Sequence, residues 1–365
     1  MGSTILTHPS GTSLAYTYDA LNRVKTVADG GGTLATYDYI GPWRALRRMN
    51  GNGTYVSYSY DGARRLIGLD YRLTANQLPV SSFQYTYDRV GNRLTETTQP
   101  GNHLTTYTYD SLYRLIVVQS PLSNTQYLYD PAGNRTQETR NGQTIPYTVD
   151  AMNRYTAIGG RALAYDANGN LRLDAENLYQ YDAFNRLVRT ADVVWSPYYL
   201  PLMAGGGSGR VASQSVSVQT SSGPPTITRH TYDALNRRVS QQVENATERY
   251  LYAGGRVIEE RDDDDALVAS YVGGLFMERD GERSFYQHDA RGSVRALADA
   301  HGAVVERVDY EAFGKPIFDG GAQSSALGNP NLWRGLRYDA DDGLYILRGD
   351  RYDPDSGRLI QVHSR

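Results

Sequence analysis

One short phrase recurs along the chain and limits its possible folds more than any other feature. Residues 16–23 read YTYDALNR and residues 231–237 read TYDALNR. The pattern Y-x-Y-D-x-x-N-R recurs at 58–65, 107–114, 147–154 and 179–186, and copies with Gly-Asn, interpreted as having one more turn residue, stand at 85–93, 127–135 and 164–171. Nine aspartates mark the repeat: Asp19, Asp61, Asp88, Asp110, Asp130, Asp150, Asp166, Asp182 and Asp233. Such periodicity indicates a repeat architecture.

Each copy of the repeat predicts a β-hairpin. The alternation of tyrosine with a smaller residue has the period of two that is typical of a strand. The aspartate follows where the chain must turn, and its carboxylate is expected to accept hydrogen bonds from backbone amides two or three residues further on. Asn, or Gly-Asn, then tolerates a positive φ. Arginine and an aliphatic residue, as in Arg186-Leu187, start the return strand.

An isolated hairpin is barely stable in water, so the units are expected to pair with one another. Roughly 28 strands at about 4.8 Å would make a sheet about 130 Å wide, and one closed ring of that width would enclose a space roughly 40 Å across. Side chains cannot fill such a space. The sequence therefore predicts an all-β fold in which repetitive β-hairpins form a hollow, spirally wound β-sheet shell. A β-propeller is the alternative, and the uneven spacing of the repeats disfavours it.

Composition fits a thin wall and argues against several functions. Cross-strand packing is the favoured role of the 31 tyrosines, ahead of stacking on a ligand. The net charge of −3 has no basic stripe, so nucleic acid is not an expected partner. The sequence has no cysteine, no apolar stretch as long as a membrane span and no recognisable signal peptide. Its six histidines lack metal-ligand spacing, so no catalytic, cofactor or metal site is expected.

Two segments interrupt the pattern. An irregular insertion at 191–228 joins an apolar, proline-broken stretch to a Gly/Ser-rich section. It is interpreted as a mobile surface excursion, with an apolar plug as the alternative. The acidic run RDDDDA at 261–266 lacks the spaced oxygen donors of a calcium loop, so it predicts a solvated hairpin tip.

The last eighty residues carry motifs of a known family. HDARGSVRAL, YEAFG, GLRYD, GLYILR and RYDPDSGRL follow one another in the segments 285–317 and 331–361. These segments resemble the RHS-repeat-associated core domain, and the upstream copies resemble YD repeats of the same family. The resemblance divides the chain into a YD-repeat shell at 1–284, which contains the insertion, a core domain that plugs one end at 285–361, and a short tail at 362–365.

The resemblance implies a structural role. In bacterial polymorphic toxins, insecticidal toxin complexes and, more distantly, teneurins, such repeats form a hollow cocoon that often seals a C-terminal toxin inside. An exported bacterial protein, cytoplasmic before export, is therefore expected, with toxin cargo or export machinery as partners. The toxin domain itself is absent from this sequence. The alternative is a Tyr-rich module that binds a glycan or a cell-surface partner.

The family's self-cleavage motif is replaced in this chain. The resemblance implies an Asp-Pro-x-Gly motif after the segment that matches 357–361, and a second such motif downstream, whose two aspartates form an aspartyl-protease-like pair. His363 and Ser364 stand where the first Asp-Pro is expected, and the second motif is missing. The chain is therefore not expected to be an enzyme. Asp353-Pro354 is interpreted as part of a turn.

Overall fold

The structure is a computed structural model that describes residues 2–193, 226–347 and 349–362. Its strands form three antiparallel sheets in which each strand pairs with the next along the chain. The described residues contain no α-helix, and their only helical segments are two short 3-10 turns, η1 (Asp319–Gly321) and η2 (Trp333–Gly335). None of these helices has the length and hydrophobicity needed to cross a membrane.

The first sheet has sixteen strands: β1 (Ser3–Thr7), β2 (Ser13–Tyr18), β3 (Val24–Asp29), β4 (Gly32–Ile40), β5 (Arg44–Asn50), β6 (Thr54–Tyr60), β7 (Leu66–Leu73), β8 (Pro79–Tyr87), β9 (Arg93–Gln99), β10 (His103–Tyr109), β11 (Leu115–Gln119), β12 (Asn124–Tyr129), β13 (Arg135–Arg140), β14 (Gln143–Val149), β15 (Tyr155–Ile158) and β16 (Arg161–Ala162).

The second sheet has fourteen strands: β17 (Ala164–Tyr165), β18 (Leu171–Leu173), β19 (Asn177–Tyr181), β20 (Leu187–Asp192), β21 (Ile227–Tyr232), β22 (Arg238–Val243), β23 (Ala246–Ala253), β24 (Arg256–Arg261), β25 (Leu267–Val272), β26 (Phe276–Arg279), β27 (Glu282–His288), β28 (Val294–Ala298), β29 (Val304–Tyr310) and β30 (Pro316–Phe318). The third has four: β31 (Arg337–Asp339), β32 (Leu344–Leu347), β33 (Asp350–Asp353) and β34 (Arg358–Leu359).

The marker aspartate closes the turn of each hairpin. The carboxylate of Asp19 accepts hydrogen bonds from the backbone amides of Leu21 at 2.9 Å and Arg23 at 3.0 Å. Asn22 between them has a φ of 59°, which asparagine tolerates. The donating amides therefore lie two and four residues after the aspartate, whereas amides two or three residues after it had been expected. The other eight marker aspartates lie at the equivalent position of their own turns.

The expected longer turn of the Gly-Asn copies is wrong, because both kinds of turn have the same length. In the turn that Asp88 closes, Gly91 takes the positive φ, at 98°. Asn92 donates to the aspartate at 2.8 Å through its side chain, which replaces the arginine of the other copies. The extra residue is therefore the arginine that follows, Arg93, which is moved one position into the strand.

A tyrosine of the next hairpin joins each turn to its neighbour. The guanidinium of Arg23 donates to Asp19 at 2.7 Å and lies 4.2 Å from the centre of the Tyr39 ring. The Tyr39 hydroxyl donates to the Val24 carbonyl at 2.7 Å. The same contacts recur for Arg65 and Tyr87, Arg114 and Tyr129, Arg154 and Tyr165, Arg186 and Tyr232, and Arg237 and Tyr252. These tyrosines pack between hairpins, as the composition indicated.

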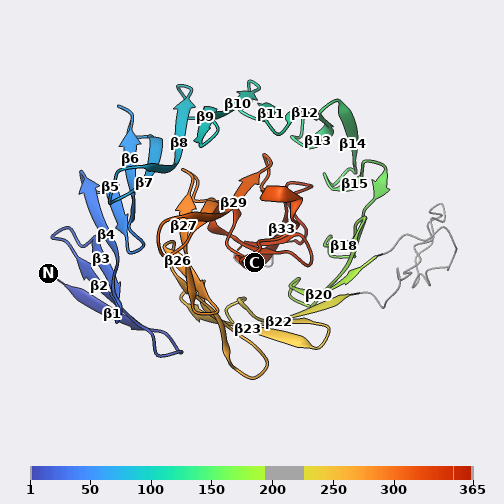
Figure 1. Ribbon diagram of the computed structural model, residues 1–365. Helices are drawn as coiled ribbons and strands as arrows, with labels where there is room; N and C mark the ends of the chain where they lie inside the picture. The colour runs from blue at the N-terminus through green and yellow to red at the C-terminus, as the bar shows by residue number, and fades with distance from the viewer. Residues whose placement is uncertain (1, 194–225, 348, 363–365) are drawn as a thin grey trace.

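The band of strands winds into a spiral whose last strands pass inside the first (Figure 1). Where the layers overlap, β2–β4 bury a shared apolar cluster with β25–β27, which includes Leu14, Val27 and Phe276. Further along, Tyr71 on β7 accepts a hydrogen bond from the amide of His288 at 2.8 Å and donates to its carbonyl at 3.1 Å. The predicted spirally wound β-shell is confirmed. Its 34 described strands exceed the rough estimate because the C-terminal part contributes short strands of its own.

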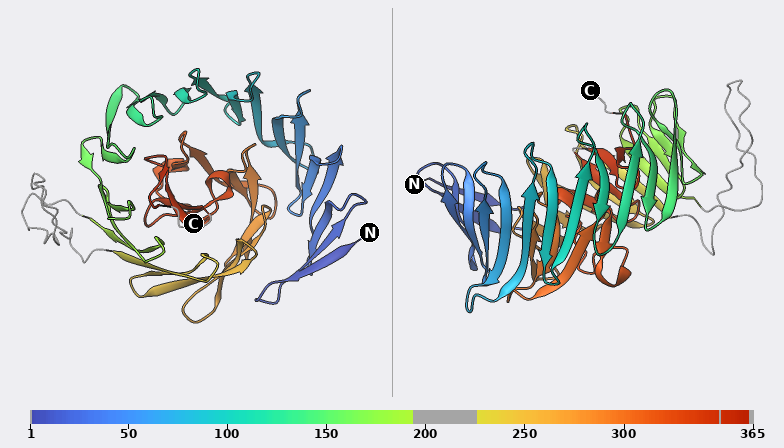
Figure 2. Two further views of the ribbon diagram at one scale, coloured as in Figure 1. Left: turned by 180° about the vertical axis from the view of Figure 1, so that it is seen from behind. Right: turned by 90° about the horizontal axis from the view of Figure 1, so that it is seen from above.

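The C-terminal sheet β31–β34 lies at the centre of the spiral (Figures 1 and 2, left). Leu344 and Ile360 pack there against Leu171, Tyr179 and Leu187 of the second sheet. The expected boundary at 284/285 falls inside β27, and the hydrogen-bonded ladder continues to β30. The division of the chain into a shell at 1–284, a core at 285–361 and a tail stays a prediction, while the separate sheet begins at Arg337.

The strands on either side of the insertion pair directly. Ala191 lies opposite Ile227 and Thr190 opposite Thr228 in the β20–β21 ladder. The insertion is therefore shorter than the expected 191–228, since its first and last residues belong to strands. Residues 194–225 lie outside the described part of the chain.

The acidic run forms the expected exposed hairpin tip, and three further turns that the repeat pattern did not predict are built in the same way. In the acidic run, Asp262 accepts hydrogen bonds from the amides of Asp264 and Ala266, at 3.0 and 2.8 Å. Asp289 and Asp299 close two further turns, and Glu311 replaces aspartate in another. They were missed because the flanking tyrosines and the Asn-Arg pair are partly lost from these copies.

We expect Asp130→Ala to lower the melting temperature, because the Asp130 carboxylate accepts hydrogen bonds from the Asn134 amide and side chain at 2.8 and 2.7 Å. The hydrogen bond from the Asn134 side chain is the main cause that lowers the pKa of Asp130. Asp264→Ala, on the exposed tip of the acidic run, is the matched control. Thermal unfolding followed by circular dichroism measures both, and equal melting temperatures would contradict the role of Asp130.

Candidate functional site: the buried polar contacts between shell and core

Arginines on the inner face of the shell reach the C-terminal part of the chain. Each stands five residues after a marker aspartate and three residues before a glutamate or glutamine: Arg93 with Glu96, Arg135 with Glu138, and Arg238 with Gln241. All six side chains are buried. A β-bulge directly after each arginine shifts the register by one residue, so that positions three apart face the same side.

The most deeply buried contact joins two arginines to one aspartate of the core. Arg238 donates both terminal nitrogens to Asp339, at 2.6 and 2.7 Å, and Arg351 donates one at 2.5 Å. Arg238 and Arg351 each expose 1% of their side chains. Burial alone would raise the pKa of Asp339, but the charges of Arg238 and Arg351 hold its pKa well below the usual range. This triad lies between β22 and the sheet β31–β34.

A histidine and an aspartate form a buried pair next to the triad. His230 Nε2 is 3.9 Å from Asp342 Oδ2, and neither atom has a hydrogen-bond partner. Burial, together with the charges of Arg351 and Arg238, lowers the pKa of His230 well below its ordinary value. Burial and the negative charge of Asp339 raise the pKa of Asp342 to about 7. The imidazole is therefore uncharged, and the contact is not a salt bridge.

A second buried carboxylate, Glu260, pairs with the arginine of the core's first strand. Glu260 on β24 accepts hydrogen bonds from Arg279 and from the Tyr271 hydroxyl, each at 2.7 Å, and pairs with Arg337 on β31. Burial would raise the pKa of Glu260, but the Arg337 charge, the Tyr271 hydrogen bond and the Arg279 charge together outweigh burial and lower the pKa. Arg337 also lies 4.5 Å from the Tyr250 ring centre.

Arg93 and Glu96 contact the inner layer of the spiral. Glu96 accepts from Arg93 at 2.5 Å and from Arg295 on β28 at 2.6 Å, and Arg295 also pairs with Asp309. A polar cavity of about 110 Å³ lies beside this group between the layers, lined among others by His103. The carboxylate is shared by both layers of the wall.

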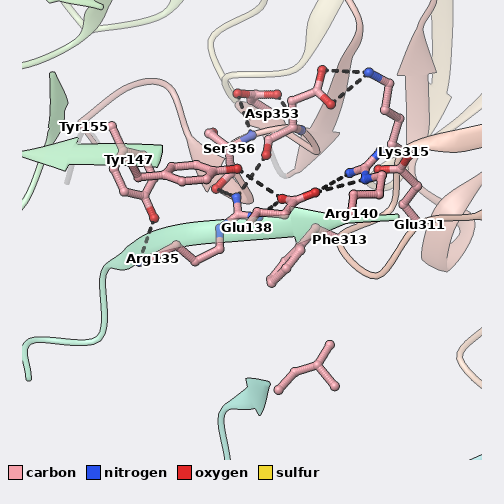
Figure 3. A network of polar contacts seen from close by, with 12 residues as sticks. Arg135, Glu138, Arg140, Tyr147, Tyr155, Glu311, Phe313, Lys315, Asp353 and Ser356 are labelled. Carbon is pink, nitrogen blue, oxygen red and sulfur yellow. Dashed lines mark hydrogen bonds and ion pairs between the residues drawn. The ribbon is translucent and has the colours of Figure 1, made fainter. Parts of the chain in front are cut away.

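Figure 3 shows the network around Arg135, which donates hydrogen bonds to the last turn of the core. Its guanidinium donates to the carbonyl of Asp355 at 2.9 Å and to that of Ser356, and lies 4.4 Å from the centre of the Phe313 ring. Glu138 on the same strand accepts from Tyr147 at 3.1 Å and from Arg140 at 2.6 Å.

The core contributes an acid and a base of its own to this network (Figure 3). Arg140 also pairs with Glu311, and Lys315 donates to Asp355 at 2.9 Å. Asp353, next to the proline of the RYDPDSGRL motif, caps the following turn by accepting from the amides of Asp355 and Ser356 at 2.8 and 3.1 Å. Burial raises the pKa of Asp353 to about 6.

These contacts can hold the core in one position inside the shell. Removal of one partner from a buried ion pair leaves a charge without compensation, which costs about 3–5 kcal/mol. Within the described residues no group of three His, Cys, Asp or Glu could hold a metal ion. His363 and Ser364, where the resemblance led us to expect an Asp-Pro, lie outside the described residues.

The sequence pattern contains a signal for these buried contacts in the arginines that follow the turns. The nine marker aspartates lie in turns, whereas the contacts to the core come from the arginines one position into the next strand. The triplet spacing R-x-x-E occurs at Arg93 and at Arg135, each directly after Gly-Asn. A second arginine next to Arg237 extends the pattern to Arg238. Gly-Asn followed directly by R-x-x-E would have identified Arg93 and Arg135 as inner arginines.

We expect Arg238→Met to lower the free energy of unfolding by about 3–5 kcal/mol, because Asp339 then loses its bidentate partner in a buried site. Arg237→Met is the matched control on the adjacent residue, whose ion pair with Asp233 is partly exposed, and should cost about 1 kcal/mol or less. Denaturant titrations of both variants test this. A similar loss for the two would argue against the buried triad.

Because the pKa of Asp342 is raised, we expect its contribution to the free energy of unfolding to depend on pH. The folded chain holds this proton up to about pH 7, whereas an unfolded aspartate loses it near pH 4, so the group's contribution to stability is present below about pH 4 and lost as the pH rises to 7. Asp342→Asn should therefore raise the free energy of unfolding at pH 8 by about 1–3 kcal/mol. Denaturant midpoints between pH 4 and 8 should show the gain shrinking towards pH 4; a gain independent of pH would contradict the assignment.

Known proteins share both the repeat and the fold. A family model described as the teneurin YD-shell matches residues 47–194. The tRNA3(Ser)-specific nuclease WapA of Bacillus spizizenii and the tRNA nuclease WapA of Bacillus subtilis are each 25% identical over 214 residues, which is 57% of this chain and 8% of each relative. The chain thus spans under a tenth of the length of these curated relatives.

Solved toxin-complex structures match nearly the whole chain. The structure of the Photorhabdus luminescens Tc holotoxin pore superposes with a TM-score of 0.77 at 19% identity, over 98% of this chain and 19% of that one. A crystal structure of TcdB2-TccC3-TEV gives 0.75 at 19% identity with the same coverage. At this identity the likeness shows the fold. The repeat, the match of residues 47–194 to the teneurin YD-shell model and the shared fold together show a β-shell of the RHS/YD-repeat type.

Proposed function

We propose that the chain is part of the wall of a bacterial toxin-type protein and that this wall encloses a C-terminal toxin absent from the sequence. The observation that carries the proposal is the spiral band that wraps around the chain's own C-terminal core and binds it through buried ion pairs. The titles of the matched structures describe toxin complexes, and the curated relatives are nucleases. Such a protein would be exported after synthesis in the cytoplasm, with its cargo or the export machinery as partner.

The end of the described chain is consistent with cargo that follows it. The Val362 amide donates to Asn170 at 2.9 Å, and the Leu171 amide donates to the Ile360 carbonyl at 2.7 Å. The chain is therefore held against the shell near β18 up to Val362. A toxin that follows would start from the inside of the spiral. Because the chain spans 19% of the matched structures, complete enclosure would use more wall than these residues supply.

The alternative function, a Tyr-rich glycan-binding module, has less support. The hydroxyl of Tyr39 donates to the Val24 carbonyl while its ring stacks on an arginine, and five equivalent tyrosines make the same two contacts. A ring that is covered by a guanidinium cannot also stack on a sugar. Saturable binding on a glycan array would favour this alternative.

A protease-protection experiment tests enclosure. An unstructured reporter of about 60 residues is fused after Arg365, and the matched control carries the same reporter before Met1, where the outer strand β1 begins the spiral. We expect proteinase K to degrade the C-terminal reporter at least tenfold more slowly than the N-terminal one. In Arg238→Met the protection should fall, because the core is held less firmly. Equal degradation of the two reporters would refute enclosure by this chain.

We also propose that the chain does not cleave itself. His363 and Ser364 stand where the family places its first aspartate and proline, and an imidazole alone cannot supply the acid and base of a carboxylate pair. The purified chain should keep its mass of 40.6 kDa at pH 4 and at pH 7. A variant with His363→Asp, Ser364→Pro and a tail that carries the second Asp-Pro-x-Gly motif should cleave. Specific cleavage of the unmodified chain, seen by intact mass spectrometry, would overturn the proposal.

A further inference from the structure

A row of exposed apolar side chains runs along one edge of the shell. In six turns the residue two positions after the marker aspartate is large, apolar and 58–73% exposed: Leu21, Val90, Leu112, Met152, Phe184 and Leu235. Trp43, in the turn between β4 and β5, is 82% exposed. Single exposed apolar residues are ordinary, but a contiguous row marks an interaction surface.

All of these turns lie on the same edge. In an antiparallel ladder every second turn lies at the same edge, and the turns named above follow β2, β4, β8, β10 and β14 in the first sheet and β19 and β21 in the second. The strands β16 and β17 are two halves of one run, so the alternation passes unbroken from the first sheet to the second. We call this edge, with its ten turns from residue 19 to residue 237, the aspartate rim.

The chemistry of the rim favours an apolar partner over an ionic one. The Asp19 carboxylate is neutralised by Arg23, and the same ion pair closes the turns at Asp110, Asp150, Asp182 and Asp233. The apolar side chains stand between these paired charges. Where an equivalent position is covered inside the molecule, Phe313 two residues after Glu311, its ring packs on Tyr127 with centroids 5.3 Å apart and on Arg135. A covered rim residue therefore packs against another β-layer.

We propose that the aspartate rim is a self-association surface, on which a second copy of this chain docks rim to rim about a two-fold axis. In the side view the strands climb along the spiral axis from the blue to the green part of the chain (Figure 2, right). A rising curve of constant pitch maps onto itself under a two-fold axis perpendicular to the spiral axis. Two copies can thus meet along the part of the row that keeps one distance from the spiral axis, whereas a flat membrane would not follow its rise. Two-fold dimers are also the commonest closed assembly.

The order of residues along the rim supports this symmetry. An axis through the middle of the ten turns brings three pairs of large residues together, Leu21 with Leu235, Trp43 with Phe184 and Val90 with Met152, and it places Ala63 opposite Asn168 and Leu112 opposite Ala132. With Tyr113, which is 61% exposed, eight large side chains contribute. At roughly 100 Å² each they supply about 800 Å² per copy, the area each partner of a typical specific interface buries. The proposal goes beyond the enclosing function and does not depend on it.

Sedimentation of the full chain across a range of concentrations tests the dimer. We expect reversible dimers in the wild type and a dissociation constant raised about 100-fold or more by the combined substitutions Leu112→Ser, Met152→Ser and Phe184→Ser. The matched control is Ile5→Ser, Leu78→Ser and Leu122→Ser, three residues that are 54–70% exposed away from the rim, which should leave the dimer unchanged. Circular dichroism checks that both variants fold, as expected for exposed positions.

Cross-linking tests the symmetry separately, since the chain has no cysteine of its own. A mixture of Leu112→Cys and Ala132→Cys proteins with a bismaleimide of about 10 Å should give mixed dimers, whereas Leu112→Cys mixed with Ile5→Cys should not. The proposal is overturned if the wild type is monomeric at about 100 µM, if the control triple variant dissociates as the rim variant does, or if both cross-linking mixtures react alike. A monomer that binds phosphatidylcholine–phosphatidylserine vesicles through the rim would assign the surface to lipid instead.

Discussion

The rest of this fold depends on the contact between an arginine of one hairpin and a tyrosine of the next. Arg23 is oriented by Asp19 and stacks on Tyr39, whose hydroxyl donates to the carbonyl directly after the same arginine. A two-stranded hairpin has too little buried surface to be stable alone. The contact ties turn to turn, so the band keeps its register at the edge even where the wall has one wet face. It also uses each tyrosine ring and hydroxyl at once, which accounts for the tyrosine-rich composition.

A shift of one position in the arginine decides whether its side chain stays at the turn or reaches the core. When arginine stands four residues after the aspartate, it stays at the turn, as Arg23 does. When asparagine takes that place, as Asn134 does, the arginine enters the strand and points inside beside Glu138. Arg237 and Arg238 show both uses in one copy. The sequence can therefore distribute wall positions and core contacts without a change in hairpin geometry.

The hairpin unit and the spiral shell could be predicted because both depend on local rules. Alternating tyrosines fix the strands, and an aspartate followed by a residue of positive φ fixes the turns, so Asp19 through Asp233 were placed in turns correctly. The buried contacts could not be predicted in this way, because Arg238 meets Asp339 across 101 residues of chain. The inward direction of these arginines also depends on a β-bulge, which the simple alternation of residues along a strand does not predict. The turns at Asp289 and Asp299 were not predicted, because only their hydrogen bonds, and not the flanking residues, match the repeat.

Ion pairs suit the contact between shell and core better than a purely apolar contact would. An apolar core against a smooth inner face could slide by one hairpin at little cost, because successive hairpins present similar surfaces. A slip by one hairpin would remove Asp339 from Arg238, Arg337 from Glu260, and the carbonyls of Asp355 and Ser356 from Arg135. Each buried charge left without a partner would cost several kcal/mol. An apolar replacement could match the stability of these pairs, but it could not select one position among repeats that look alike.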